Sequence, residues 1–401
     1  MTEENMSRLD ELIQQYCPDG VEWKALYSIT KQFSGMTGVS NKWAEEGNCV
    51  FIDYNNVYNH TSVDTTALKI ATVKSLKQNT LKKGDILFTS ASETPDECAL
   101  SSVIEKDLPD GVFLDDHLFG LRLLDEYSSV ISPSYLKYAF RSEQFRFQIK
   151  KVVRGATRHY VSKVDFMKLE IPVPPLPVQE EIVRILDNFT ELQAELQAEL
   201  QKRKQQYNYY RDNLLSNGGN NAEYLAIPEF AELKAGKAIK ATELSSIMDE
   251  NHSYPCFGGN GIRGFIKKAS HNGDYAIIGR QGALCGCVNW ASGEFYATEH
   301  AVVCTPRFNV SSRYLYHLFT VADLNQYKSQ GAQPGLSVQR LNELVFPIPS
   351  IAEQQRIVSI LDRFDTLTTD LTQGLPAEIE KRRQQYEFYR DKLLTFKRKE
   401  A

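Results

Sequence analysis

Two acid–histidine pairs carry side chains that are able to transfer protons or bind anions. Asp116 precedes His117, and Glu299 precedes His300. Such pairs could contact DNA bases or phosphates, or could act in general acid–base catalysis. Each pair stands before an apolar run, LFGLRL or AVVC, which predicts a β-strand and favours a structural hydrogen-bonding role. No nucleophile, metal cluster or partner carboxylate accompanies either pair at a recognisable spacing.

A glycine-rich stretch, GGNGIRG, contains the pattern G-x-G-x-x-G at Gly259, Gly261 and Gly264. A dinucleotide site needs a helix that opens at this point and an acidic residue about 20 residues further on. Instead FIKKAS and another glycine-rich turn follow, so we interpret these glycines as turns in a β-rich domain.

A second partial motif, PDGVEWK, has the residue types of a nuclease site in Asp19, Glu22 and Lys24. The acids lie close together near the start of the chain, and we interpret the match as chance. The sequence contains neither N-P-P followed by an aromatic residue, for amino methylation, nor G-x-x-x-x-G-K-S/T, for ATP. We therefore predict no catalytic residue and no metal ligand in this chain.

Basic residues gather between positions 137 and 163, where eight lysines and arginines stand against one acid, with aromatic residues interleaved. Clustered positive charge of this kind favours phosphate neutralisation, and a solvated basic helix is the alternative. The residues of this half predicted to bind DNA are Lys150, Lys151, Arg154, Arg158, His159 and Lys163. In the second half they are Asn260, Arg263, Lys267, Lys268, Arg280 and Gln281, of which the amides can read adenine edges.

The composition indicates a soluble globular protein of two or more domains, with 401 residues, 42% hydrophobic and 24% charged. The seven cysteines are scattered without a C-x-x-C pair, which fits a reduced cytoplasmic protein without a cysteine zinc site. The first residues lack an apolar signal region, and no apolar run approaches 18 residues, so we expect neither secretion nor membrane insertion. The formal net charge of −5 counts against a simple nucleic-acid binder.

The sequence contains an internal repeat. IPVPPLPVQEEIVRILD at 171–187 pairs with FPIPSIAEQQRIVSILD at 346–362, and KRKQQYNYYRDNLL at 202–215 pairs with KRRQQYEFYRDKLL at 381–394. Fainter echoes link GDILFTS with GDYAIIG, SYLKYAF with RYLYHLF, and RGATRHYVS with QGAQPGLS. Between the two strong blocks, only the first copy holds three successive copies of the tetrapeptide T/A-E-L-Q, as TELQAELQAELQ at 190–201.

Each copy predicts a long helix after a proline-rich lead. Apolar residues at steps of three and four form a seam at Ile182, Ile185, Phe189, Leu192 and Leu196, and again at Ile357, Ile360, Phe364, Leu367 and Leu371. Some 40 residues make a rod of about 60 Å, which suits a spacer. Gly374 and Pro376 should bend or interrupt the second helix.

The predicted fold is α+β, with a pseudo-two-fold internal repeat. Two α/β domains are each followed by a long helix, and the two helices pack as an antiparallel coiled coil. The predicted boundaries are 1–170 for the first domain, 171–217 for the central helix, 218–345 for the second domain and 346–401 for the C-terminal helix.

These blocks resemble the specificity subunits of Type I restriction–modification systems, over essentially the whole chain. The doubled P-x-P, Q-x-x-I-V-x-I-L-D and Q-Q-Y-x-Y/F-Y-R-D-x-L-L patterns carry the resemblance, together with GGNGIRG, IGRQGALCG and ATEH. It implies a non-catalytic subunit with two target-recognition domains, each reading half of a bipartite asymmetric site in double-stranded DNA. It also implies that the helices hold these domains apart and dock two adenine methyltransferase subunits and, through them, restriction–translocase subunits. S-adenosylmethionine, ATP and Mg²⁺ would then belong to the partners.

The aromatic ends of the helices suit either a protein interface or the core of the coiled coil. The residues predicted to bind a partner are Tyr207, Tyr210, Arg211, Tyr386, Tyr389 and Arg390. A standalone two-domain DNA-binding protein or scaffold, without an enzyme partner, is the rival hypothesis.

Overall fold

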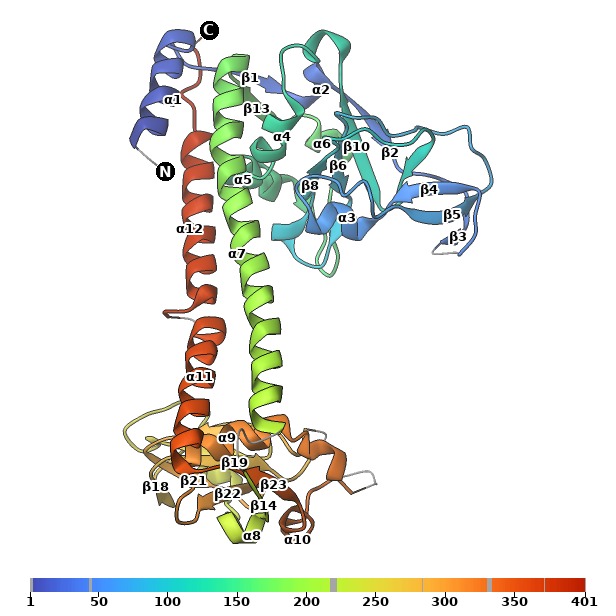
Figure 1. The fold of residues 1–401 in the computed structure, drawn as a ribbon. Coiled ribbons are helices and arrows are strands. Elements are labelled where there is room, and N and C mark those ends of the chain that lie inside the picture. The colour runs from blue at the N-terminus through green and yellow to red at the C-terminus, as the bar shows by residue number, and fades with distance from the viewer. Residues whose placement is uncertain are drawn as a thin grey trace. The chain divides into compact units, whose positions relative to one another are not determined.

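The computed structural model describes residues 3–42, 45–216, 222–282, 284–329, 334–370 and 372–400, with side chains from residue 8 onward. The chain divides into two compact units, and each contains both sheet and helix (Figure 1). The first unit comprises residues 1–195 and 380–401, and the second comprises residues 196–379. The predicted α+β class is thus confirmed. The boundary predicted at 217–218 lies outside the described residues.

The first unit holds two four-stranded sheets, in the orders β2-β10-β6-β8 and β3-β5-β4-β9, with a ribbon β1-β13 and a small sheet β11-β12-β7. Its strands are β1 (Glu22–Ala25), β2 (Thr30–Ser34), β3 (Val39–Lys42), β4 (Cys49–Ile52), β5 (Lys69–Val73), β6 (Ile86–Thr89), β7 (Ala91–Ser92), β8 (Ser101–Val103), β9 (Val112–Leu114), β10 (Leu118–Leu123), β11 (Val153–Arg154), β12 (His159–Val161) and β13 (Glu170–Val173). Its helices are α1 (Glu3–Tyr16), α2 (Leu26–Ile29), α3 (Tyr54–Asn59), α4 (Pro133–Ala139), α5 (Glu143–Val152) and α6 (Lys163–Phe166), with the 3-10 turns η1 (Pro95–Glu97) and η2 (Asp125–Tyr127).

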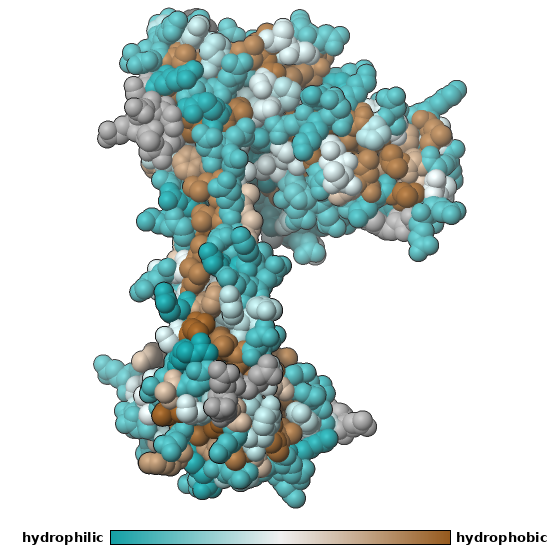
Figure 2. Space-filling view, viewed as in Figure 1, coloured by the Kyte–Doolittle hydropathy of each residue, from teal (hydrophilic) through white to brown (hydrophobic). Residues whose placement is uncertain are grey.

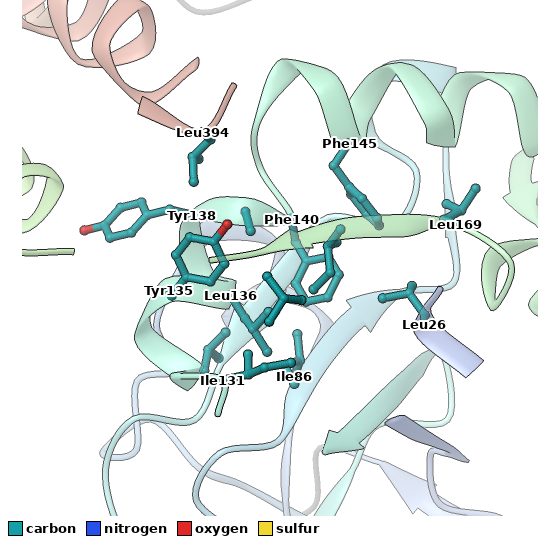
Figure 3. Close-up of a cluster of buried hydrophobic side chains, with 14 of the residues drawn as sticks. Leu26, Ile86, Ile131, Tyr135, Leu136, Tyr138, Phe140, Phe145, Leu169 and Leu394 are labelled. Atoms are coloured by element: carbon teal, nitrogen blue, oxygen red, sulfur yellow. The ribbon is translucent and has the colours of Figure 1, made fainter. Parts of the chain in front are cut away.

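Strand β6 shows why the GDILFTS run is a strand. Alternate side chains of a strand point to opposite faces, and both faces of β6 are buried. Ile86 and Phe88 join the core beneath α4 and α5, whereas Leu87 joins a second core on the other face. Figure 3 shows Ile86, Phe140 and Phe145 among the buried side chains of the first of these cores.

The second unit repeats this plan, with sheets ordered β15-β22-β19-β20 and β17-β16-β21-β18 and a ribbon β14-β23. Its strands are β14 (Glu223–Ala226), β15 (Ala231–Ala235), β16 (Tyr254–Gly258), β17 (Gly261–Ile266), β18 (His271–Asn272), β19 (Tyr275–Gly279), β20 (Val288–Ala291), β21 (Glu294–Ala297), β22 (Ala301–Pro306) and β23 (Val345–Ile348). Its helices are α8 (Ile227–Phe230), α9 (Ser312–Val321), α10 (Val338–Asn342) and α11 (Ile351–Thr369), with the 3-10 turns η3 (Ala241–Glu243) and η4 (Leu324–Tyr327).

Paired residues of the sequence repeat make the same contacts in the two units. The buried amide of Gln179 accepts from Ser132 N at 2.9 Å and donates to two backbone carbonyls, while Gln354 accepts from Ser311 N at 2.9 Å and also donates to two. The hydroxyl of Tyr135 donates to the backbone of the first ribbon at 3.0 Å, and that of Tyr314 does the same in the second. The internal repeat is therefore a repeat of structure.

The first long helix, α7 (Leu176–Ser216), is continuous over 41 residues. The second copy is divided as predicted, since α11 ends at Thr369 and α12 (Leu375–Leu393) begins six positions later. The amide of Gly374 donates to Asp370 O at 3.0 Å, and a Cβ at this glycine would lie only 2.4 Å from Thr366 O. This tight turn excludes a side chain and explains why the helix breaks here.

Within the first unit α7 runs beside α12 in the opposite direction, and within the second unit it runs beside α11 in the same manner (Figure 1). Phe189 stacks on Tyr389 with ring centroids 5.5 Å apart in the first unit, and Tyr207 and Tyr210 lie against Phe364 in the second. Apolar residues are visible in a broken line along these helices (Figure 2). Antiparallel helix packing is thus present in each unit.

The predicted seam of the second copy holds from Ile357 to Phe364, which packs against Tyr207 of α7, and is wrong at Leu367. Ile357 is buried as expected, but Leu367 is exposed, and Leu361 and Thr368 are buried instead. A straight helix turns away from a strict seven-residue repeat by about 20° per heptad, so the buried face rotates. Leu371 lies outside the described residues. In the first copy Ile182, Ile185 and Phe189 are buried, whereas Leu192 and Leu196 are half-buried.

Candidate nucleic-acid interface

Each unit has a crevice at the end of its main sheet. In the first unit it measures 670 Å³ and lies between α3, the β7 segment and the β11–β12 hairpin. The residues that line it are Tyr54, Tyr58, Ala91, Ser92, Glu93, Glu97, His117, Thr157 and Arg158. In the second unit it measures 730 Å³ and is lined by Gly258, Gly259, Asn260, Gly261, Ile262, Arg263, Gln281, Gly282, His300, Pro334 and Gly335.

The two crevices occupy equivalent places in the repeat. The carbonyl of His117 accepts from Ser90 N at 3.1 Å, and the carbonyl of His300 accepts from Arg280 N at 2.9 Å. In each unit, the segment that leads into a short helix borders the crevice. In the first unit this segment precedes α6, and its Tyr160 pairs with Ala91. In the second unit it precedes α10, and its Gly335 forms a β-bridge with Gln281. The fainter echoes of the sequence therefore converge at these crevices. Residues 330–333 of the QGAQPGLS echo lie outside the described residues.

The acid–histidine pair of the first unit is held by a lysine from strand β3. Lys42 Nζ lies 2.9 Å from Asp115 Oδ1 and also contacts Asp116, and His117 Nδ1 lies 2.8 Å from Asp116 Oδ1. Partial burial works against the charged forms, but the hydrogen bonds outweigh it, so the pKa of Lys42 is raised and that of Asp116 is lowered. Asp115, Asp116 and His117 are close enough to share a cation, and the Lys42 ammonium supplies that positive charge.

The pair of the second unit is less completely bonded. His300 Nε2 lies 3.2 Å from Glu299 Oε1. Three buried atoms nearby, Arg280 Nε, Glu299 Oε2 and His300 Nδ1, have no hydrogen-bond partner among the described residues. A buried polar atom without a partner is costly. The site therefore retains unused capacity to donate and to accept.

A carboxylate and a guanidinium face the first crevice. Glu97 accepts from the hydroxyls of Tyr58 and Thr94, each at 2.7 Å, and these hydrogen bonds, with that of Tyr58 the stronger, hold the pKa of Glu97 below its usual range. A carboxylate that stays ionised can only accept, so it suits an amino group and repels a phosphate. Arg158 lines the same crevice and can meet a phosphate or a guanine edge.

The other basic residues predicted for the first unit are spread over its surface. Arg154 pairs with Asp165 at 2.6 Å, Lys150 pairs with Asp96 at 2.7 Å, and Lys163 Nζ donates to Ser34 Oγ at 3.1 Å. Lys151 lies 4.3 Å above the Phe147 ring, and His159 is half-buried on β12 beside the crevice. The structure thus places only Arg158 of this set in the crevice lining.

Three members of the basic cluster are structural. Lys137 is buried between Glu105 and Asp187, and Arg141 and Arg146 donate to backbone carbonyls of neighbouring loops. Burial lowers the pKa of Arg141 to about 10. These three residues of the 137–163 cluster are therefore engaged within the unit, because a count of charge along the sequence does not show which side chains turn inward.

The second crevice brings together Asn260, Arg263 and Gln281, and Arg280 lies half-buried behind it. Lys267 and Lys268 are exposed on the turn after β17, outside the crevice lining. The glycine-rich stretch forms the β16–β17 turn, which confirms turns in a β-rich domain and not a dinucleotide loop. A Cβ at Gly259 would lie 2.6 Å from Gln281 O, so the crevice wall there is bare backbone.

Sequence reasoning missed the residues of the first crevice that lie far from the basic cluster. They are Tyr54, Tyr58, Glu93 and Glu97. The available signal was the Gly84-Asp85 run, because the strand that it opens leads straight into β7 and η1. In the nuclease-like triplet, Glu22 and Lys24 simply form an ion pair at 2.9 Å on β1.

The residues predicted to bind a partner mostly pack within their own unit. Tyr386 lies edge-on to Tyr138, Tyr389 stacks on Phe189, and Tyr207 lies against Phe364. Arg211 covers the Tyr207 ring, and Arg390 covers the Tyr386 ring in the same way. These contacts agree with the alternative interpretation of the aromatic residues, in which they form the core between the packed helices.

The chain is similar to known proteins over most of its length. The model of a family described as the Type I restriction modification DNA specificity domain matches residues 18–203 and 220–381. The Type I restriction enzyme EcoprrI specificity subunit of Escherichia coli is 37% identical over 373 residues, which cover 88% of this chain and 90% of that protein.

Two solved structures share the fold. The S subunit of a Type I restriction–modification system from M. genitalium aligns with a TM-score of 0.54 at 16% identity, over 94% of this chain and 96% of that one. The HsdS subunit of Thermoanaerobacter tengcongensis aligns with a TM-score of 0.51 at 17% identity, with the same coverage. Among the described residues, no helix is both long and apolar enough to cross a membrane.

Proposed function

The chain belongs to the family of Type I restriction–modification specificity subunits, the non-catalytic DNA-recognition subunits of these systems, and on this premise we propose that its two units read the two halves of a bipartite asymmetric target. The recognition domains in this proposal are residues 1–170 and 218–345. The helical segments 171–217 and 346–401 hold the half-sites at a fixed spacing.

The observation that carries the proposal is the pair of equivalent crevices with different linings. The first presents an ionised carboxylate, Glu97, with Arg158, and the second presents the side chains of Asn260, Arg263 and Gln281. Asparagine and glutamine pair with adenine, arginine pairs with guanine, and carboxylates accept from the amino group of cytosine. One architecture with two chemistries suits two different half-sites, and so an asymmetric target.

The proposal assigns the catalytic work to partners. Two adenine methyltransferase subunits dock on this chain, and restriction–translocase subunits join through them. S-adenosylmethionine, ATP and Mg²⁺ belong to those subunits, and the assembly acts in the cytoplasm on double-stranded DNA. The negative net charge of this chain is then compatible with DNA binding, because the partner subunits supply further contacts with phosphates.

The test replaces crevice residues one at a time and maps methylated adenines in cells that carry the partner genes. Arg158→Ala should relax recognition in one half-site only, and Gln281→Ala should relax recognition in the other only. A change of both half-sites by either variant would contradict independent reading. Exchange of residues 21–165 for those of another family member should likewise alter one half.

Co-purification separates this function from its rival. The chain expressed with its neighbouring genes should elute as a complex with the methyltransferase. A chain that binds DNA but never retains a methyltransferase would instead be a standalone DNA-binding protein or scaffold.

A further inference from the structure

The carboxylate of Glu97 is held in one orientation at the first crevice. Its Oε1 accepts from the hydroxyl of Tyr58 at 2.7 Å, and its Oε2 accepts from the hydroxyls of Thr94 at 2.7 Å and Ser92 at 3.2 Å. These donors come from α3, from the residue that precedes η1 and from β7, and Glu97 itself ends η1. Because separate segments fix this side chain, it is already placed for a ligand, and binding costs little ordering of the side chain.

The hydrogen bonds also limit what Glu97 can bind. A carboxylate offers about four lone-pair sites, and the three hydroxyls occupy three of them. These donors, with Tyr58 the strongest, hold the pKa of Glu97 below its usual range, so the group is charged near neutral pH. An ionised carboxylate cannot donate, and the remaining lone pair therefore requires one N–H group of a ligand.

Arg158 makes this negative charge compatible with DNA. Its guanidinium lines the same crevice, is exposed, and has no hydrogen bond or ion pair among the described residues. Burial and then Glu97 raise the pKa of Tyr54, whereas Arg158 acts in the opposite direction, so both charges lie near the Tyr54 hydroxyl. The positive charge offsets the repulsion between Glu97 and the DNA phosphates. Since no ion pair joins Glu97 to Arg158 in this part of the structure, the carboxylate keeps its free lone pair.

The base edges of the major groove differ in how well they suit such a carboxylate. Cytosine presents an amino donor there, whereas guanine presents the acceptors O6 and N7. Adenine also offers an amino group, but its N7 acceptor would face the carboxylate. Thymine offers an acceptor and a methyl group, and phosphates offer acceptors only. A carboxylate with one free lone pair therefore suits cytosine.

We propose that Glu97 is the residue that selects cytosine in the half-site of the first unit, by accepting a hydrogen bond from the N4 amino group in the major groove. This inference rests on the proposed function and deepens it, since it names the base and the atom that one side chain contacts. Among the described residues that line the second crevice there is no carboxylate, so this contact distinguishes the two half-sites.

One experiment maps methylated adenines in cells that carry the partner genes with the wild-type chain or a variant. The half-site of the first unit, identified by exchange of residues 21–165, should contain cytosine at a fixed position. Glu97→Gln is nearly isosteric and gains an amino donor. It should admit adenine at that position, because glutamine pairs with adenine, and it should leave the other half-site unchanged.

A second experiment measures how tightly the complex of this chain with the methyltransferase encoded beside it binds a duplex that carries the mapped site. Glu97→Gln should bind about 5- to 140-fold more weakly, which corresponds to about 1–3 kcal/mol of base discrimination at 1.4 kcal/mol per tenfold. The wild type should lose a similar factor on a duplex in which pyrimidin-2-one, which lacks only the 4-amino group, replaces this cytosine. The variant on the modified duplex should lose no more than either change alone, because both changes remove the same contact.

Matched variants separate base reading from charge and from folding. Glu93→Gln removes the other carboxylate charge of the crevice lining, and should leave the preference for cytosine unchanged. Tyr58→Phe removes one hydroxyl that orients Glu97, and should weaken the preference at the same position by less than Glu97→Gln does. Thermal unfolding identifies a variant that fails to fold. If Glu97→Gln fails to fold, Tyr58→Phe and the modified duplex decide the result.

Three results would overturn the proposal. The first is a half-site of the first unit without cytosine, and the second is full selectivity in both Glu97→Gln and Tyr58→Phe. The third is an equal relaxation by Glu93→Gln, which would assign the effect to charge. If the wild-type complex methylated no bipartite site, the proposed function itself would fail, whereas a bipartite site that does not respond to Glu97→Gln would refute this inference alone.

Discussion

Deletion of one tetrapeptide from α7 should change the gap between the two DNA half-sites. The variant lacks Ala194–Gln197 and retains two of the three TELQ-like copies. The deleted segment has little packing to lose, because three of its four side chains are exposed and Leu196 is only half-buried. The contacts of Phe189 with Tyr389 and of Tyr207 with Phe364 lie on either side of it.

Helix geometry sets the size of the change. Four residues correspond to about 6 Å of rise and to one full turn plus about 40°. One base pair of DNA corresponds to about 3.4 Å of rise and about 35° of rotation. Length alone therefore predicts a gap shorter by about two base pairs, whereas rotational phase predicts one.

We favour one base pair, because a domain that is out of phase cannot enter the groove, while a few ångströms of length can be absorbed by tilt. The second copy can adapt at its break, since α11 and α12 are separate helices joined between Thr369 and Leu375.

The assay is single-molecule mapping of methylated adenines in cells that carry the deletion variant. Both half-sites should keep their sequences, and the non-specific gap between them should shorten by one base pair. Insertion of one further AELQ, as a fourth copy of the tetrapeptide, is the matched control and should lengthen the gap by one base pair. Full activity with an unaltered gap would refute the spacer role and leave the repeat as a surface helix.

Three further predictions concern the two units separately. Gln179→Leu would leave one backbone amide and two backbone carbonyls without their hydrogen bonds, so it should destabilise the first unit by about 3 kcal/mol or more. Gln354→Leu should destabilise the second unit in the same way. Hydrogen exchange measures the stability of each unit. Arg158→Ala should reduce the slope of log DNA affinity against log salt concentration by about 0.9 per phosphate contact. Arg154→Ala should reduce this slope by less, because Arg154 pairs with Asp165. Equal slopes for the wild type and both variants would count against a phosphate contact of Arg158. The pKa of Asp116 is lowered in the folded chain, so the stability that this carboxylate contributes is present above its pKa in the unfolded chain and is lost as pH falls through its folded pKa. Lys42→Met should therefore raise the folded pKa of Asp116 in an NMR titration. An unchanged pKa of Asp116 in this variant would show that Lys42 is not the cause.

The sequence alone determined the repeat, because residues that make the same buried contact must keep the same chemistry. Gln179 and Gln354 stand at matching positions of the two related blocks, and each accepts a hydrogen bond from a backbone amide ahead of a helix in its unit. The break of the second helix was also readable, since a glycine and a proline act locally. The strands predicted at LFGLRL and AVVC are confirmed as β10 and β22, because a near-continuous apolar run suits a strand that is buried on both faces.

The tertiary structure decided which polar and aromatic side chains face solvent. Lys137, Arg141 and Arg146 counted as part of a basic surface in the sequence, yet each turns inward, because carboxylates and carbonyls from distant segments come within reach only after folding. The crevices likewise join segments that are separated by many residues, such as Tyr54 and Arg158, and their pairing depends on sheet order. The same principle separates Tyr209 from Tyr207: two positions along a helix are about 200° of rotation, and only the packed partner shows which ring is buried.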